Sequence, residues 1–303
     1  MTRPLLEAIG ERPLLSDGAM GTQLMYAGLE SGACGEAWNV EHPDRVLAIQ
    51  RRYVQAGADC LLTNTFGGSR IMLRRHGHEG DVAVLNRAAV EIARAAFDGA
   101  EGWVIGDIGP FGGLLEPYGE FTEQEVREAF GEQARALVGA GADAIIVETQ
   151  TSLEELGIGV LAAREAGAPC VIGSLAYDVT LDGSTFRTMM GIDPERAAEF
   201  MEECGVDIVA LNCGTGMDMA RAREAVSRYR AVSSRPVMAQ PNAGKPRLVD
   251  LKVQYDETPE EMTRGVVPLL EAGARIIGGC CGSTPEHIRA FRIAMDQYLG
   301  QHA

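Results

Sequence analysis

The sequence predicts an α/β protein with a single (β/α)8 barrel, the TIM-barrel fold. Three observations lead to this prediction. Eight short runs rich in Ile, Val and Leu have the continuous apolar character of strands buried on both faces. Stretches with helical spacing separate most of these runs. The length of 303 residues also suits eight β–α units, which typically occupy about 250 residues or more.

The eight candidate strands follow one another at the intervals that a barrel needs. In chain order they are PLLSDG (13–18), CLLTNTF (60–66), WVIGDIGP (103–110), AIIVET (144–149), CVIGSLAY (170–177), IVALNC (208–213), RPVMAQPNAG (235–244) and IIGGCC (276–281). Clear helical segments lie between them, for example at 42–57 and 122–141.

A short glycine pattern marks the boundaries between helices and strands. Five of the strands are preceded by a small residue, glycine and another small residue, at 56–59, 140–143, 166–169, 204–207 and 272–275. The glycine of such a pattern fits the left-handed position just beyond a helix C-terminus. Each of these five strands is therefore expected to follow a helix directly.

The main rival is an open, doubly wound sheet. That fold normally carries a Gly-x-Gly-x-x-Gly fingerprint after its first strand, whereas here the first strand runs into DGAMGTQ (17–23). No Pro- or Ser-rich linker and no block of charge divides the chain. We therefore expect one barrel domain over residues 1–303.

The charge balance excludes several classes of partner. Lys and Arg total 27 against 43 Asp and Glu, which gives a formal net charge of −16. Nucleic acids and anionic membrane surfaces select cationic faces.

The N-terminus has no signal-peptide pattern and no run reaches about 18 apolar residues. We therefore expect a cytoplasmic protein whose seven cysteines are not structural disulfides.

The cysteines at two strand ends form the most specific chemical pattern. In a barrel, the chemistry lies at the C-terminal ends of the strands. Cys213 ends the sixth strand, and Cys280 and Cys281 end the eighth. Three thiolates suit Zn²⁺, and three protein ligands leave a fourth position open, as in catalytic zinc sites. Two other interpretations stay open: buried cysteines that act as small hydrophobes, and a disulfide between Cys280 and Cys281.

Such a zinc site favours chemistry at sulfur. A thiol that coordinates zinc loses its proton, so the site would supply a thiolate near neutral pH, where a free thiol is mostly protonated. Hydrolytic zinc sites instead favour His and carboxylate ligands.

The motifs at the strand ends resemble those of the homocysteine S-methyltransferase family in order and spacing. The resemblance covers nearly the whole chain and is greatest to the homocysteine-binding barrel of cobalamin-dependent methionine synthases. It is carried by SDGAMGTQL (16–24), AGADCLLTNTFGGSR (56–70), GDIGP (106–110), VET (147–149), LNCG (211–214), PNAGKP (241–246) and GGCCGSTPEHIR (278–289).

The resemblance implies a TIM barrel whose zinc ion is bound by Cys213, Cys280 and Cys281. It also implies that two carboxylates, Asp17 of DGAMG and Glu148 of VET, hold the amino group of the substrate. An ammonium group at the rim of a barrel would be matched by two such carboxylates. Their alternative roles are a capping aspartate and a solvated glutamate.

The substrate carboxylate is expected to meet backbone N–H groups and short polar side chains. Gly18, Asn64 and Thr65 are the candidates, because backbone amides near glycine can approach an anion closely. Asn242 is expected to shape the rim. For Asn64, Thr65 and Asn242, structural roles in the turns after the strands stay open.

The resemblance implies transfer of a methyl group to zinc-bound homocysteine, which gives methionine. The D-x-H-x-x-G signature of a cobalamin module is absent from the sequence, so the donor is expected to arrive from outside the barrel. A methylated corrinoid protein or methylcobalamin is favoured by the likeness to methionine synthase. S-methylmethionine is the alternative, and another thiol acceptor or the reverse reaction stays open. A betaine-like donor would need an aromatic cage, which Trp38 and Trp103 do not indicate.

Two functions of other classes remain as alternatives. One is an aldolase or lyase that uses a barrel lysine such as Lys245. The other is a non-catalytic barrel that binds a thiol amino acid.

Overall fold

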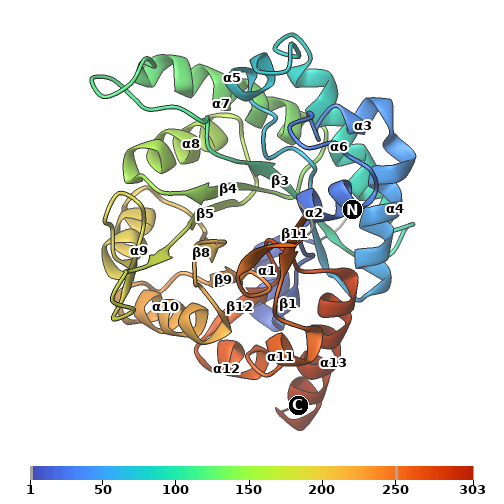
Figure 1. The fold of residues 1–303 in the computed structure, drawn as a ribbon, viewed down its shortest axis with the longest axis vertical. Helices are drawn as coiled ribbons and strands as arrows, with labels where there is room; N and C mark the ends of the chain where they lie inside the picture. Colours follow the sequence, from blue (N-terminus) through green and yellow to red (C-terminus); the bar gives the residue numbers. More distant parts are fainter. Residues whose placement is uncertain (1–2, 250–251, 303) are drawn as a thin grey trace.

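The computed structural model describes residues 3–249 and 252–302 and forms an eight-stranded parallel barrel surrounded by helices (Figure 1). The strands are β1 (Leu14–Leu15), β2 (Cys60–Leu62), β3 (Trp103–Ile108), β4 (Ala144–Gln150), β5 (Val171–Leu175), β8 (Ile208–Asn212), β9 (Val237–Gln240) and β12 (Ala274–Ile277). Their order in the sheet is β1-β12-β9-β8-β5-β4-β3-β2. All eight predicted strands are confirmed.

Hydrogen bonds between β1 and β2 join the two ends of this sheet. Ser16 forms a parallel bridge with Cys60. The backbone N–H of Asp59 donates to the carbonyl of Leu15 at 2.7 Å, and the N–H of Asp17 donates to the carbonyl of Cys60 at 3.0 Å. The sheet is therefore closed between its first and second strands, as the barrel prediction requires.

Helices cover the outside of the barrel between successive strands (Figure 1). The longer ones are α4 (Pro43–Gln55), α6 (Val82–Ala96), α7 (Glu123–Gly139), α8 (Leu153–Glu165), α9 (Pro194–Glu203), α10 (Met219–Val232) and α13 (Pro285–His302); the shorter ones are α2 (Met20–Tyr26), α3 (Trp38–Glu41), α5 (Arg70–Arg74), α11 (Pro259–Thr263) and α12 (Val266–Glu271). Within the described ranges, no helix combines the length and the apolar character needed to cross a membrane.

An N-terminal helix that the sequence analysis did not predict, α1 (Leu5–Glu11), packs at the N-terminal ends of the strands. Its buried residues Leu5, Ala8 and Ile9 belong to the same apolar cluster as Leu14 and Trp103, which start β1 and β3. This end of the barrel is thus filled by apolar side chains, and the opposite end is left for polar chemistry.

The glycine pattern that separates helices from strands is confirmed. All five glycines adopt a left-handed backbone, with φ between 77° and 107°: Gly57, Gly141, Gly167, Gly205 and Gly273. Residues with a Cβ atom rarely adopt this conformation. The pattern therefore reports the true helix C-termini.

Two hairpins at the C-terminal rim were not predicted. One joins β6 (Asp178–Val179) to β7 (Phe186–Arg187), and the other joins β10 (Pro246–Val249) to β11 (Lys252–Tyr255). They follow β5 and β9, and the β10–β11 hairpin lies in front of the barrel in the view of Figure 1. The two hairpins thus add further segments of chain to the rim where the sequence locates the site.

Candidate metal centre and substrate cavity

The three cysteines predicted to bind zinc lie together at the C-terminal rim. Cys213 follows β8, and Cys280 and Cys281 follow β12. Their Sγ atoms all lie within 4.8 Å of one another. The Cys213–Cys281 and Cys280–Cys281 sulfur separations are 3.9 and 4.0 Å. In the described part of the chain, no other group of three or more His, Cys, Asp or Glu residues has ligand atoms this close.

These distances fit a tetrahedral zinc site. Zinc–sulfur bonds of about 2.3 Å place the sulfurs of such a site roughly 3.8 Å apart. They do not fit a disulfide, in which the sulfurs are bonded at about 2.05 Å, and all seven cysteines are free. Hydrogen bonds from Cys213 and Cys280 lower the pKa of the Cys281 thiol, whereas the hydrogen bonds within the cluster and burial raise the pKa of the Cys280 thiol. The donor set and its spacing suit Zn²⁺.

Neighbouring strands hold the cluster in place. The N–H of Cys213 donates to the carbonyl of Gln240 at 3.2 Å, and the N–H of Cys280 donates to the carbonyl of Pro241 at 2.8 Å. The side-chain amide of Asn212 donates to Cys280 Sγ at 3.8 Å. Cys213 itself has a φ of 56°, a backbone region that few residues other than glycine adopt. The surrounding sheet therefore imposes the orientation of its thiol.

The cysteines form one wall of a cavity of about 390 Å³. Seven of the nine predicted site residues line it: Gly18, Asn64, Thr65, Glu148, Cys213, Cys280 and Cys281. Asp17 and Asn242 do not line it. Both are buried, and they lie close in sequence to Gly18 and Gln240, which do line the cavity. The predicted residues that line this cavity thus come from the ends of five different strands.

Glu148 presents a buried carboxyl group to this cavity. Its side chain is only 8% exposed and accepts a hydrogen bond from the hydroxyl of Thr149 at 3.4 Å. Burial, followed by the nearby Cys213 and Asp17, raises the pKa of Glu148 to about 8. A cationic ligand would stabilise the ionised carboxylate, because the described residues that line the cavity include no basic side chain.

The carboxylate of Asp17 is hydrogen-bonded mainly to other groups of the protein. Its Oδ2 accepts a hydrogen bond from the backbone N–H of Leu62 at 3.0 Å, and its Oδ1 accepts one from the hydroxyl of Ser16 at 3.1 Å. Burial raises its pKa to about 7. A carboxylate has about four acceptor sites, so these two bonds leave about two of them for further donors.

The other polar candidates have structural partners. Asn64 donates to the carbonyl of Gly35 at 2.8 Å, and Thr65 donates to the carbonyl of Asp107 at 2.6 Å. The amide of Asn242 donates to the carbonyl of Gly214 at 3.0 Å. These bonds shape the turns around the cavity.

Sequence reasoning missed several polar residues at the site, among them Asp107, Thr149 and Asn212. Asp107 and Thr149 line the cavity, and Asn212 bonds both to Thr149 and to Cys280. All three lie within the motifs GDIGP, VET and LNC at strand ends. Their position at strand ends could have indicated a role in the site. Their hydrogen-bond partners lie on other strands, so no local sequence pattern shows them.

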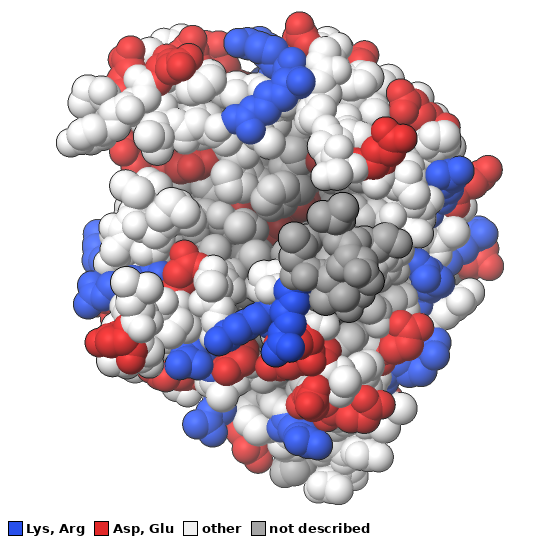
Figure 2. Space-filling view, viewed as in Figure 1, with Lys and Arg blue, Asp and Glu red and all other residues white. Residues whose placement is uncertain are grey.

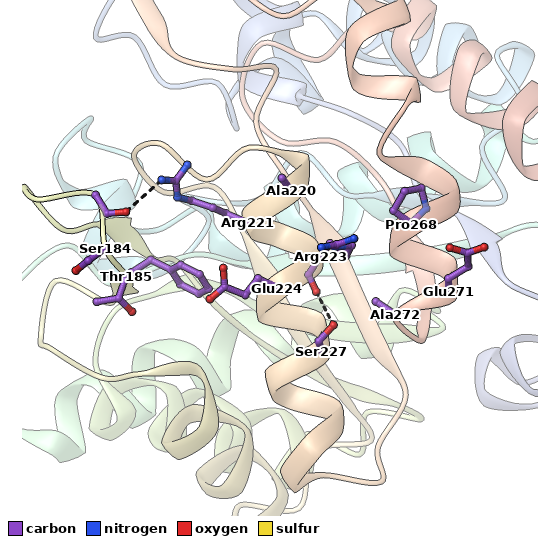
Figure 3. A pocket seen from close by; sticks show the side chains of 12 residues that line it. Ser184, Thr185, Ala220, Arg221, Arg223, Glu224, Ser227, Pro268, Glu271 and Ala272 are labelled. Atoms are coloured by element: carbon purple, nitrogen blue, oxygen red, sulfur yellow. Dashed lines mark hydrogen bonds between the residues drawn. The ribbon is translucent and has the colours of Figure 1, made fainter.

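A larger hollow of about 630 Å³ lies outside the barrel, between the β6–β7 hairpin, α10 and α12 (Figure 3). Its side chains include Arg221, which donates to the carbonyl of Gly183 at 3.5 Å, and Ser227, which donates to the carbonyl of Arg223 at 3.1 Å. It contains none of the predicted site residues and no cysteine. The smaller cavity inside the rim is therefore the candidate site.

Comparison with known proteins gives consistent matches. A family model described as homocysteine S-methyltransferase matches residues 14–295. Methionine synthase from Mycobacterium leprae (strain TN) is 33% identical over 306 residues, which cover 96% of this chain and 25% of that protein. Methionine synthase from Mycobacterium tuberculosis (strain ATCC 25618 / H37Rv) is 35% identical over 308 residues, with the same coverage. The chain thus spans about a quarter of the length of these relatives.

Solved structures show the same fold. The metallated form of the homocysteine methyltransferase MmuM from Escherichia coli superposes with a TM-score of 0.77 at 21% identity, covering 95% of this chain and 99% of that one. Its oxidized form gives a TM-score of 0.78 at 21% identity, covering 96% and 98%. These likenesses establish the TIM-barrel architecture.

Proposed function

Since the chain belongs to the homocysteine S-methyltransferase family, we propose that it methylates the sulfur of homocysteine to form methionine, using a zinc ion held by Cys213, Cys280 and Cys281. The observation that carries this proposal is the group of three sulfurs within 4.8 Å of one another on the wall of a cavity that also contains buried carboxylates. Such a cavity suits a ligand with a thiol at one end and an ammonium group at the other.

Zinc, when bound, would keep the acceptor sulfur in its nucleophilic thiolate form. The three cysteines would hold the ion and leave one position open for that sulfur. Glu148, with Asp17 beside it, would bind the substrate ammonium. The backbone at Gly18 and the turn that contains Asn64 and Thr65 would face the substrate carboxylate, while Asn242 would support the rim.

The reaction itself is a displacement. A bond forms between the acceptor sulfur and the methyl carbon while the bond from that carbon to the donor breaks, and the bonding electrons leave with the donor. The contribution of the protein is to hold the sulfur and the methyl group in line. The cavity lies at the open rim, so a donor can approach from outside the barrel.

We propose a methylated corrinoid protein or methylcobalamin as the donor, because the curated relatives at 33–35% identity are methionine synthases. S-methylmethionine is the alternative. The seven free cysteines are consistent with a reducing compartment, and we propose that the protein acts in the cytoplasm. The domain extent of 1–303 also remains a prediction.

A donor screen tests the proposal. Zinc-loaded protein is incubated with homocysteine and, separately, methylcobalamin, S-methylmethionine or betaine, and methionine is measured by mass spectrometry. We expect methionine with methylcobalamin; formation from S-methylmethionine alone would replace the proposed donor. If no donor gives methionine, the proposed activity is contradicted, whether or not the protein binds homocysteine. A Lys245→Ala variant that keeps full activity would count against a lysine-dependent lyase.

A further inference from the structure

We propose that Asp107 is a specificity residue, whose carboxylate joins that of Glu148 in binding the ammonium group of the acceptor. The site would then accept thiols that carry a free amino group and reject those that lack one. This inference rests on the proposed function and adds a recognition residue that the sequence motifs did not assign.

The side chain of Asp107 is buried without a partner for one of its oxygens. Asp107 lies on β3, is only 5% exposed and lines the same cavity as the cysteines. Its Oδ1 has no hydrogen-bond partner among the described residues. A buried acceptor without a protein partner costs free energy, so a ligand that donates a hydrogen bond to this oxygen would gain binding free energy.

The backbone of Asp107, from which this carboxylate extends, is held by three hydrogen bonds. Its N–H donates to the hydroxyl of Thr63 at 2.9 Å. Its carbonyl accepts from the hydroxyl of Thr65 at 2.6 Å and from the side-chain amide of Gln133 at 3.2 Å. The three bonds anchor both sides of the residue. The point at which the carboxylate enters the cavity is therefore fixed by the backbone.

The sheet places Asp107 and Glu148 on the same side of neighbouring strands. Asp107 pairs with Ile146 in the β3–β4 register. Side chains alternate along a strand, so Glu148, two residues after Ile146, points to the same side as Ile146. Ile146 and Ile105, two residues before Asp107, both belong to the cluster inside the barrel. Both carboxylates therefore point inward.

The charge of the cavity favours a cation. Burial and the neighbouring carboxylates Glu148, Glu36 and Asp17 raise the pKa of Asp107 well above its usual range. No Lys, Arg or His lies among the described residues that line the cavity. Figure 2 shows acidic atoms at the bottom of the hollow near the centre of this face, with the basic side chains farther out. An ammonium group would supply both the missing donor and the missing positive charge.

Equilibrium binding tests this inference without any methyl donor. Zinc-loaded wild type, Asp107→Asn and Asp44→Asn are titrated by calorimetry with homocysteine and with 4-mercaptobutanoate, which lacks the amino group. Asp44 is an exposed aspartate on α4 and is the matched control. We expect Asp107→Asn to weaken homocysteine binding about tenfold to hundredfold and to leave binding of 4-mercaptobutanoate nearly unchanged. Asp44→Asn should behave as the wild type.

The outcomes separate this inference from the proposed function. Equal weakening of both thiols in Asp107→Asn, or loss of zinc from that variant, would overturn the role in specificity while homocysteine binding by the wild type still supports the acceptor. A wild type that binds both thiols equally would overturn the inference even if the variant failed to fold. A wild type that binds no homocysteine would contradict the proposed function as well.

Discussion

The side chain of Asn212, the last residue of β8, holds Thr149 of β4 at two points. Asn212 Oδ1 accepts the backbone N–H of Thr149 at 3.1 Å, and its Nδ2 donates to Thr149 Oγ1 at 2.7 Å. Thr149 has a φ of 57°, which is unusual for a β-branched residue. Asn212 precedes Cys213 and Thr149 follows Glu148, so this pair links the cysteine cluster to the carboxylate that faces the cavity.

Replacing Asn212 should therefore damage both stability and substrate binding. In Asn212→Ala, the N–H of Thr149 and the hydroxyl of Ser174, which donates to Asn212 at 2.7 Å, lose a buried partner. We expect the free energy of unfolding to fall by about 2–4 kcal/mol and homocysteine binding to weaken. Urea unfolding and calorimetry measure the two effects. Wild-type affinity in Asn212→Ala would show that this link does not position Glu148.

Zinc content should depend on three of the seven cysteines. We expect about one zinc per chain in the wild type, by elemental analysis, and well below one in Cys213→Ala and Cys281→Ala. Cys204→Ala is the matched control, because Cys204 is half-buried at the end of α9 and outside the cluster. Full zinc content in the cluster variants would refute the assignment of these ligands.

Stability should depend on pH through Glu155, a buried residue of α8. Its carboxylate accepts the N–H of Phe111 at 2.8 Å, and burial raises its pKa from 4.5 to about 7. From about pH 4.5 to pH 7 the folded state then holds a proton that the unfolded state has lost, so the free energy of unfolding falls as the pH rises. The fall levels off as the pH rises above 7, where the carboxyl group of the folded state also ionises.

Between pH 4.5 and pH 8, we expect the free energy of unfolding to fall by about 2–3 kcal/mol less in Glu155→Gln than in the wild type. Urea unfolding across this range measures it. Glu154→Gln changes the exposed neighbour on the same helix and should leave the pH dependence as in the wild type. Identical curves for the two variants would mean that Glu155 does not titrate as its burial implies.

Gly214 should tolerate no side chain, because the chain turns there directly after Cys213. Its φ is 88°, and a Cβ atom would lie 1.7 Å from the carbonyl oxygen of Tyr177. Gly167 has a similar φ of 79° but nothing within 4 Å of a Cβ atom. We expect Gly167→Ala to cost about 1–2 kcal/mol and Gly214→Ala at least twice as much, with reduced zinc content. Equal losses in urea unfolding would mean that the turn at Gly214 can relax.

The strands and the metal ligands were predictable because their signals are local. Continuous apolar runs, the glycines before them and paired cysteines at two strand ends can all be recognised within a few residues. The common rim of a barrel then brings Cys213 within reach of Cys280 and Cys281, although about 70 residues separate them in the sequence.

The roles of the carboxylates depended on contacts that no local pattern contains. Asp17 and Asp107 both lie beside glycine at a strand end. They differ because the N–H of Leu62, 45 residues after Asp17, occupies one Asp17 oxygen, whereas an oxygen of Asp107 has no partner in the described part of the chain. The two rim hairpins escaped prediction for a related reason, since their strands are only two to four residues long.

The central claim is that the three-cysteine cluster activates homocysteine sulfur for methylation. The most direct measurement is the rate of methionine formation from homocysteine and methylcobalamin by zinc-loaded wild type, chelator-treated wild type, Cys280→Ser and Cys204→Ser. We predict that the rate is lost on chelation, returns when zinc is restored, is absent in Cys280→Ser and is kept in Cys204→Ser. Full methionine formation by zinc-free protein or by Cys280→Ser would contradict the claim.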